Sequence, residues 1–232
     1  MTPTAVQTAE DLLHFREPGK TAELVRGVLI VREPPGTGHG ACSARLTLRV
    51  GAFVEQRELG EVFAQDTGFK IERDPDTVRA PDVAFVPRER LAQIPEAGYA
   101  ELAPDWVAEI LSPSDRPGEV LEKVGQWLGA GVRVVWVLDQ VRRDARVYRA
   151  DGTISTVGPD DELDGEDVLP GFRCPLRDIL SVSCTPAEKA ETGLSARPHA
   201  SLRRALPPTD TQALPLGPSR WSRRALRPAR RG

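Results

Sequence analysis

The chain has 232 residues, 40% hydrophobic and 28% charged, which suffices for one core of ordinary size. No run of apolar residues is long enough to span a membrane, and residues 1–10 lack the order of a signal peptide, so we expect a cytoplasmic protein. The cysteines, Cys42, Cys174 and Cys184, have no paired spacing. They argue against both a disulfide framework and a structural zinc site.

The charge is divided unevenly along the chain. Residues 186–232 hold ten Lys or Arg against three acidic residues, whereas residues 1–185 hold 21 against 31. We expect a folded domain over residues 1–183 and a basic, Pro/Arg-rich tail over residues 184–232, with a composition typical of disorder. Arginines of this tail are an alternative site for nucleic-acid phosphates.

The first half of the domain predicts one short helix, a hairpin and one long helix. Thr8 is placed to cap a helix that ends before Pro18-Gly19, and strands over residues 21–25 and 28–32 follow. Apolar residues then recur at helical spacing from about residue 39 to 59, with Gly60 as the terminator. The arginines of this helix either line an approach for DNA or form a solvated face: Arg45, Arg49 and Arg57.

The second half predicts a mixed sheet. Strand-like runs cover residues 61–65, 68–72, 81–86, 105–111 and 132–138, followed by a hairpin over 146–157 and a helical turn over 176–180. A helix over 115–130 lies between the last two of those runs, which indicates a parallel crossover. We therefore predict an α/β fold with a mixed β-sheet flanked by helices.

Two carboxylates occur where a buried strand is normally apolar. Asp82 precedes the run Val83 to Val86, and Glu109 lies within Trp106 to Leu111, on the strand face of Val107 and Leu111. On neighbouring strands the two acids converge on one hard cation such as Mg²⁺ or Mn²⁺, which needs only one or two protein carboxylates. Alternatively, Asp82 caps a turn and Glu109 pairs with an arginine.

A lysine completes this candidate site. The apolar arc of the helix over 115–130 comprises Val120, Leu121, Val124, Trp127 and Leu128. Lys123 lies at the edge of that arc, from which a long side chain can extend past the packing to the acids. The alternative is a solvated lysine.

These residues resemble the Uma-type restriction endonuclease family of the PD-(D/E)XK nuclease superfamily over roughly residues 8–180. The resemblance rests on these segments: 22–27, His39, 81–86, 109–114, Lys123, 130–132, 135–139 and 164–172. It implies a restriction-endonuclease-like core in which Asp82, Glu109, Lys123 and Glu23 are catalytic, Asp82 and Glu109 hold the metal, and His39 contacts substrate. The superfamily lysine two residues after the second acid is replaced by Leu111, so its role passes to Lys123. Glu23 is implied to hold a second metal or a ligand water.

The leading hypothesis is accordingly a Mg²⁺-dependent DNA endonuclease that hydrolyses phosphodiester bonds. The alternative is a catalytically inactive nuclease-fold protein that acts in nucleic-acid binding or protein interaction, with a homodimer through a sheet edge as one form. A hydrolase of another phosphodiester is a third hypothesis. The acidic charge of residues 1–185 opposes DNA binding unless local cations or metal ions line the approach.

The tail should be dispensable for folding. Its composition has no core pattern, so truncation after Ser183 should leave the melting temperature nearly unchanged in a thermal melt. A large decrease would show that the tail packs on the domain. If the tail supplies nonspecific affinity, truncation should instead weaken DNA binding and flatten its salt dependence.

Overall fold

The computed structural model describes residues 7–180. The tail expected from residue 184 onward lies outside these described residues, and its boundary stays a prediction. Within residues 7–180 no helix has both the length and the apolar character needed to cross a membrane.

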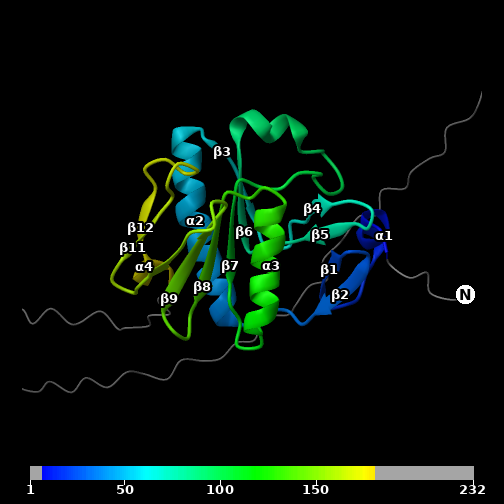
Figure 1. The fold of residues 1–232 in the computed structure, drawn as a ribbon, viewed down its shortest axis with the longest axis horizontal. Coiled ribbons are helices and arrows are strands. Elements are labelled where there is room, and N and C mark those ends of the chain that lie inside the picture. The colour runs from blue at the N-terminus through cyan, green and yellow to red at the C-terminus, as the bar shows by residue number, and fades with distance from the viewer. Residues whose placement is uncertain (1–6, 181–232) are drawn as a thin grey trace, which may run out of the picture. The chain divides into compact units, whose positions relative to one another are not determined.

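A six-stranded mixed sheet forms the centre of the fold, in the order β10-β9-β8-β7-β6-β3 (Figure 1). Its strands are β3 (Gly60–Ala64), β6 (Val83–Pro87), β7 (Trp106–Ile110), β8 (Val134–Asp139), β9 (Asp144–Arg149) and β10 (Ile154–Val157). β7 and β8 pair in parallel, and α3 (Pro117–Gly129) connects them. The predicted crossover and the α/β class with a mixed sheet are therefore confirmed.

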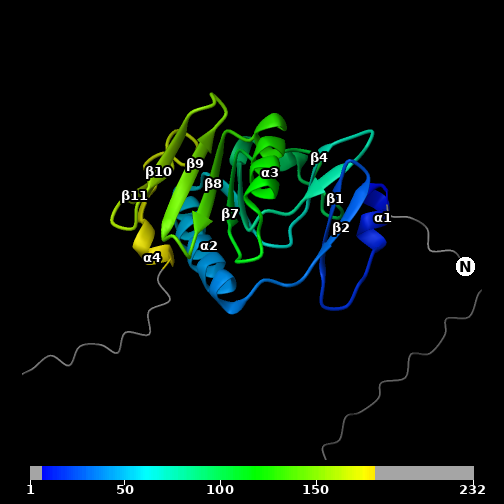
Figure 2. The ribbon, with the colours of Figure 1, turned by 60° about the horizontal axis from the view of Figure 1, so that its bottom comes forward.

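Two helices cover opposite faces of this sheet. α2 (Thr37–Arg57) packs against β3, β6 and β7, and α3 packs against β8 (Figures 1 and 2). Residues of β7 alternate between the two sides: Trp106 and Ala108 join the core under α2, whereas Val107 joins the core under α3. By this alternation Glu109 belongs to the α3 side, as its spacing predicts.

A second sheet is built around the N-terminal hairpin, in the order β2-β1-β5-β4. Its strands are β1 (Thr21–Val25), β2 (Val28–Arg32), β4 (Phe69–Glu72) and β5 (Thr77–Arg79), and α1 (Ala9–His14) packs on β1. The capping box expected at Thr8 is present, with Asp11 as its partner. The sequence pattern missed β5, because all three of its residues are buried and show no alternation.

Short elements complete the chain. They are the 3₁₀ helix η1 (Arg88–Gln93), β11 (Glu162–Asp164), β12 (Arg173–Pro175) and α4 (Leu176–Leu180). The helical turn predicted over residues 176–180 is confirmed by α4, whereas η1, β11 and β12 have no counterpart among the predicted elements.

The end of the long helix differs from its prediction. α2 ends at Arg57, and Glu58 forms the left-handed C-cap with φ 53°, so Gly60 does not terminate the helix. Gly60 instead begins β3, where a Cβ atom would collide with the carbonyl oxygen of Val86. Its lack of a side chain therefore serves the pairing of β3 with β6.

The arginines of α2 do not line an approach to the acids. Arg45 donates to the carbonyl of Ile179 at 2.8 Å, Arg49 pairs with Asp178 at 3.3 Å, and Arg57 lies over the ring of Phe53. The contacts of Arg45 and Arg49 fasten α4 to α2, on the sheet face opposite to that of Glu109.

The burial pattern of α2 supplies a matched test of the core. Leu46 is fully buried and Leu48 is 72% exposed on the same helix. Leu46→Ala should lower the free energy of unfolding by about 2–5 kcal/mol, because it removes packed methyl groups and leaves a cavity. Leu48→Ala should change it by no more than about 0.5 kcal/mol in the same urea titration. Equal losses would contradict the placement of this helix.

Candidate active site

A cleft of about 820 Å³ lies on the α3 side of the fold and receives residues from both sheets. All five residues singled out from the sequence line it: Glu23, His39, Asp82, Glu109 and Lys123. The structure thus brings together side chains from β1, α2, β7, α3 and the segment just before β6.

The two acids lie opposite each other on neighbouring strands. β6 and β7 are antiparallel, with Val83 facing Ala108, and the same register continued by one residue sets Asp82 opposite Glu109. Asp82 is held there because its Oδ2 accepts a hydrogen bond of 2.6 Å from the backbone N–H of Ile110. Directly opposed residues of antiparallel strands have Cβ atoms about 4.5–5.5 Å apart, so the two carboxylates share one neighbourhood.

Glu109 is buried and both of its carboxylate oxygens accept hydrogen bonds from α3. Lys123 Nζ donates to Oε2 at 2.8 Å, and Trp127 Nε1 donates to Oε1 at 2.7 Å. Burial raises the pKa of Glu109 to about 7; the charge of Lys123 opposes this increase and that of Asp82 adds to it. A positive charge beside Glu109 therefore stabilises the ionised form of its carboxylate.

Lys123 connects two acids of the cleft, Glu109 from the six-stranded sheet and Glu23 from the four-stranded sheet. Its Nζ is 2.8 Å from Glu109 Oε2 and 3.4 Å from Glu23 Oε1, and it also donates to the carbonyl of Ala80 at 3.3 Å. Burial acts to lower its pKa, but the carboxylates of Glu109 and Glu23 outweigh burial and raise it. Lys123 is thus a charged lysine in the site, and the alternative of a solvated helix residue is wrong.

Glu23 is occupied by protein partners. Its Oε2 pairs with Arg79 at 2.8 Å, and its Oε1 accepts from the backbone N–H of Ala80 at 2.9 Å. Burial would raise its pKa, but the charges of Lys123 and Arg79 lower it below the ordinary value. Arg79 is itself buried and donates to Gln126 of α3 at 2.8 Å. Glu23 therefore lies in an ion pair rather than open to a metal.

His39 contacts the first acid. Its Nε2 is 3.2 Å from Asp82 Oδ1, and the imidazole is 9% exposed. Burial acts to lower its pKa, but the hydrogen bond to Asp82 and the charge of Asp82 raise it above the ordinary value. The carboxylate of Asp82 thus favours protonation of the imidazole, whose buried Nδ1 has no hydrogen-bond partner among the described residues.

The donor set suits a metal that keeps several waters. Asp82 and Glu109 offer carboxylate oxygens on one side of the cleft, and within residues 7–180 no three His, Cys, Asp or Glu side chains form a group able to hold an ion by themselves. Mg²⁺ is commonly bound by one or two carboxylates, with waters and substrate phosphate completing its octahedron. Each oxygen of these two carboxylates already has one protein partner, so such an ion would use their remaining lone pairs, and the two residues form no cage by themselves.

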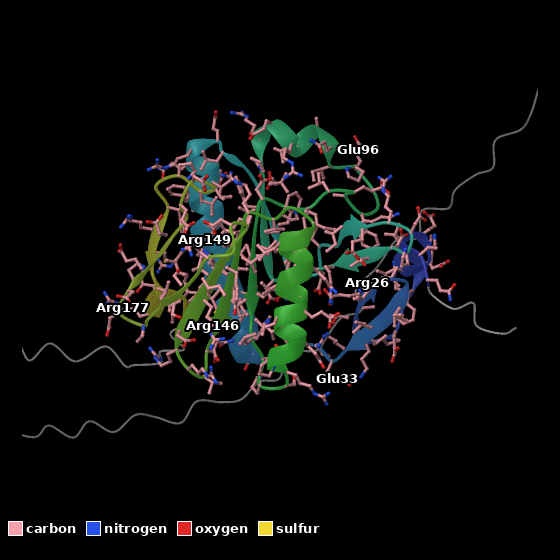
Figure 3. All side chains as sticks on the ribbon, viewed as in Figure 1. Arg26, Glu33, Glu96, Arg146, Arg149 and Arg177 are labelled. Carbon is pink, nitrogen blue, oxygen red and sulfur yellow. The ribbon has the colours of Figure 1, made fainter. Side chains whose placement is uncertain are left out.

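Charge along the cleft is predominantly acidic. Eight acidic and four basic residues line it, the basic ones being Arg16, Lys20, Arg32 and Lys123. Among the lining residues Arg32 is 3.6 Å from Glu119 of α3, and Lys20 pairs with Glu33, which is labelled in Figure 3. Together with Lys123, which pairs with Glu109 and Glu23, three of the four cations are thus already paired with acids of the same cleft.

The protein is of the α/β class, with a mixed sheet, two acids opposed on adjacent strands and a lysine from the following helix. The Uma2 family model, described as "Putative restriction endonuclease", matches residues 7–179, and the chain belongs to this family. The resemblance drawn from the sequence motifs is confirmed.

A solved structure supports the fold independently. The chain resembles a protein from Anabaena variabilis whose structure is titled as that of "a putative nuclease belonging to DUF820". The TM-score is 0.64 at 21% identity, over 75% of this chain and 97% of that chain. Among curated proteins no relative matches. At this identity the likeness shows a shared fold.

Sequence patterns missed two residues of the site. Trp127 was assigned to the apolar arc of α3, and it does pack there, but its N–H also reaches Glu109. Its position four residues after Lys123 was the available signal, since such residues share a helix face. Arg79 lies in the unpredicted strand β5, so nothing marked it as the partner of Glu23. Leu121, placed in the same arc, is 52% exposed.

The buried pair of Arg79 and Glu23 should be important for stability. Arg79→Met should lower the free energy of unfolding by about 3–5 kcal/mol, because Glu23 loses the nearer of its two cations and its Oε2 is left buried without a donor. Adding Glu23→Gln should recover part of that loss. The control is Arg88→Met, which breaks the exposed pair with Glu58 and should cost about 0–1 kcal/mol. A similar loss for both arginines in urea denaturation would contradict this assignment.

Proposed function

We propose that this protein is a Mg²⁺-dependent DNA endonuclease that hydrolyses phosphodiester bonds. The observation that carries the proposal is the geometry of Asp82 and Glu109, opposed on β6 and β7, with Lys123 Nζ 2.8 Å from Glu109. Membership of a restriction endonuclease family supports the same reading. Mn²⁺ is expected to replace Mg²⁺, because both accept carboxylate oxygens.

In this proposal Asp82 and Glu109 hold the metal. When bound, Mg²⁺ supplies Lewis-acid polarisation of the phosphate and lowers the pKa of a coordinated water. The backbone N–H of Ile110 orients Asp82, and α3 orients Glu109. These contacts prepare both carboxylates before any ligand arrives, which reduces the reorganisation that binding requires.

Lys123 is the proposed electrostatic catalyst. Its ammonium lies beside Glu109 and is kept charged by two carboxylates, so it can stabilise negative charge that develops on the attacked phosphate and orient the attacking water. During hydrolysis that water would form the new P–O bond and give up a proton to solvent, as the bond to the leaving oxygen breaks and that oxygen takes a proton from solvent. No proton needs to leave Lys123 in this role.

Glu23 and His39 take supporting roles. Because Arg79 and Ala80 occupy the carboxylate of Glu23, we assign to it the placement of Lys123 in preference to the second metal that the resemblance implies. His39 lies beside Asp82 and lines the cleft, where a positive imidazole would attract a phosphate to the same end. The contact between His39 and substrate that the resemblance implies is thus proposed as an attraction between the imidazole and a phosphate.

The acidic lining of the cleft is the strongest argument for the alternative, a nuclease-fold protein that has lost catalysis. Eight acids against four bases repel a polyanion in the absence of bound cations. The same excess of acidic over basic residues is expected of a site that takes up divalent ions before substrate. Metal-dependent nicking of plasmid DNA separates the two hypotheses, since an inactive protein produces none.

The replaced lysine gives the sharpest test of mechanism. Leu111 follows Glu109 by two residues and lines the same cleft, so a lysine at position 111 should reach the region that Lys123 reaches from α3. Lys123→Ala should abolish Mg²⁺-dependent nicking, and adding Leu111→Lys should restore measurable activity. Initial rates on supercoiled plasmid compare the variants, with Asp82→Asn as the inactive metal-site control.

Two results would count against this mechanism. If Lys123→Ala nicks plasmid as fast as the wild type, the lysine has no catalytic part. If the double variant folds, binds Mn²⁺ and still does not cleave, the two positions do not share a role. Melting temperatures of each variant control for the loss of apolar packing at Leu111.

A further inference from the structure

Helix α3 holds both oxygens of Glu109 with one pair of side chains. Lys123 and Trp127 are four residues apart and therefore lie on one face of the helix. The ammonium donates to Oε2 at 2.8 Å and the indole N–H donates to Oε1 at 2.7 Å. The carboxylate is thus fixed in rotation as well as in position.

The two donors differ in how freely they can move. Lys123 has further acceptors within reach, Glu23 at 3.4 Å and the carbonyl of Ala80 at 3.3 Å, so it can leave Glu109 without losing all its partners. Trp127 is fully buried in the core under α3, where packing fixes its ring. Its N–H is a donor only and does not ionise.

We propose that Trp127 is the positioning residue that sets the orientation of Glu109 for a divalent metal. This inference rests on the proposed function and gives Trp127 a role that its place in an apolar arc does not reveal. When Lys123 turns toward a phosphate, the indole keeps Oε1 in place, so that the remaining lone pairs of Glu109 still face the cleft.

Other tryptophans of this chain show that the contact is not a general result of burial. Trp106 and Trp136 are also fully buried, and their Nε1 atoms have no hydrogen-bond partner among the described residues. They pack edge to face at 4.9 Å on the α2 side of the sheet. The hydrogen bond of Trp127 is therefore a local property, and Trp106 offers a matched control.

The test compares Trp127→Phe with Trp106→Phe, two substitutions that each remove part of one fully buried indole. Isothermal titration calorimetry with Mn²⁺ alone measures the affinity of each folded variant. Loss of a partner that orients a metal ligand typically weakens metal binding by about 10–100-fold, which is the loss expected for Trp127→Phe. Trp106→Phe should bind Mn²⁺ like the wild type, although its core is similarly disturbed.

A second variant covers the case in which Trp127→Phe does not fold. Replacing Trp127 with β-(3-benzothienyl)alanine keeps the shape of the ring and exchanges the N–H for sulfur, so any fall in Mn²⁺ affinity comes from the lost hydrogen bond. If both variants bind Mn²⁺ as the wild type does, Trp127 only packs and the inference is wrong, while the proposed function stands. If the wild type itself binds no Mn²⁺, the proposed function fails and the inference fails with it.

Discussion

The ion pair between Glu109 and Lys123 is the interaction on which the site depends. A carboxylate on a central strand of the sheet loses its water on folding, and this cost is offset only when charged or polar donors replace the water. α3 supplies both donors, one to each oxygen. The crossover that pairs β7 with β8 in parallel is also what brings this helix over Glu109, so the topology and the charge pair are two aspects of one arrangement.

A chain of buried charges extends from this pair to the second sheet. Lys123 lies between Glu109 of the main sheet and Glu23 of the N-terminal hairpin, and Arg79 joins Glu23 to Gln126 of α3. Each member has a partner from a different element. Breaking one link leaves a charge uncompensated in the interior, which makes the docking of the small sheet and the shape of the cleft interdependent.

The sequence reveals those parts of the site that interrupt a regular pattern. Asp82 and Glu109 are visible because each adjoins an apolar strand, and Lys123 because it borders a packed arc. Trp127 is hidden for the opposite reason: an aromatic residue in an apolar arc satisfies the pattern, and its hydrogen bond depends on tertiary placement. Arg79 is hidden because a three-residue, fully buried strand has no period to detect. The end of α2 differs from its predicted position because Glu58 adopts the cap conformation that glycine usually takes.

Electrostatics joins these local arrangements to the proposed reaction. Around the two opposed acids, Asp82, Glu109 and Glu23 outnumber the cations Arg79 and Lys123 by one charge, and burial raises the pKa of Glu109 in the absence of a further cation. A proton, the imidazolium of His39 or a divalent ion would each relieve this excess, but only the divalent ion carries two positive charges, so that one remains for a phosphate after the excess is neutralised. An acidic cleft is therefore compatible with a polyanionic substrate on one condition, that the metal enters before the substrate.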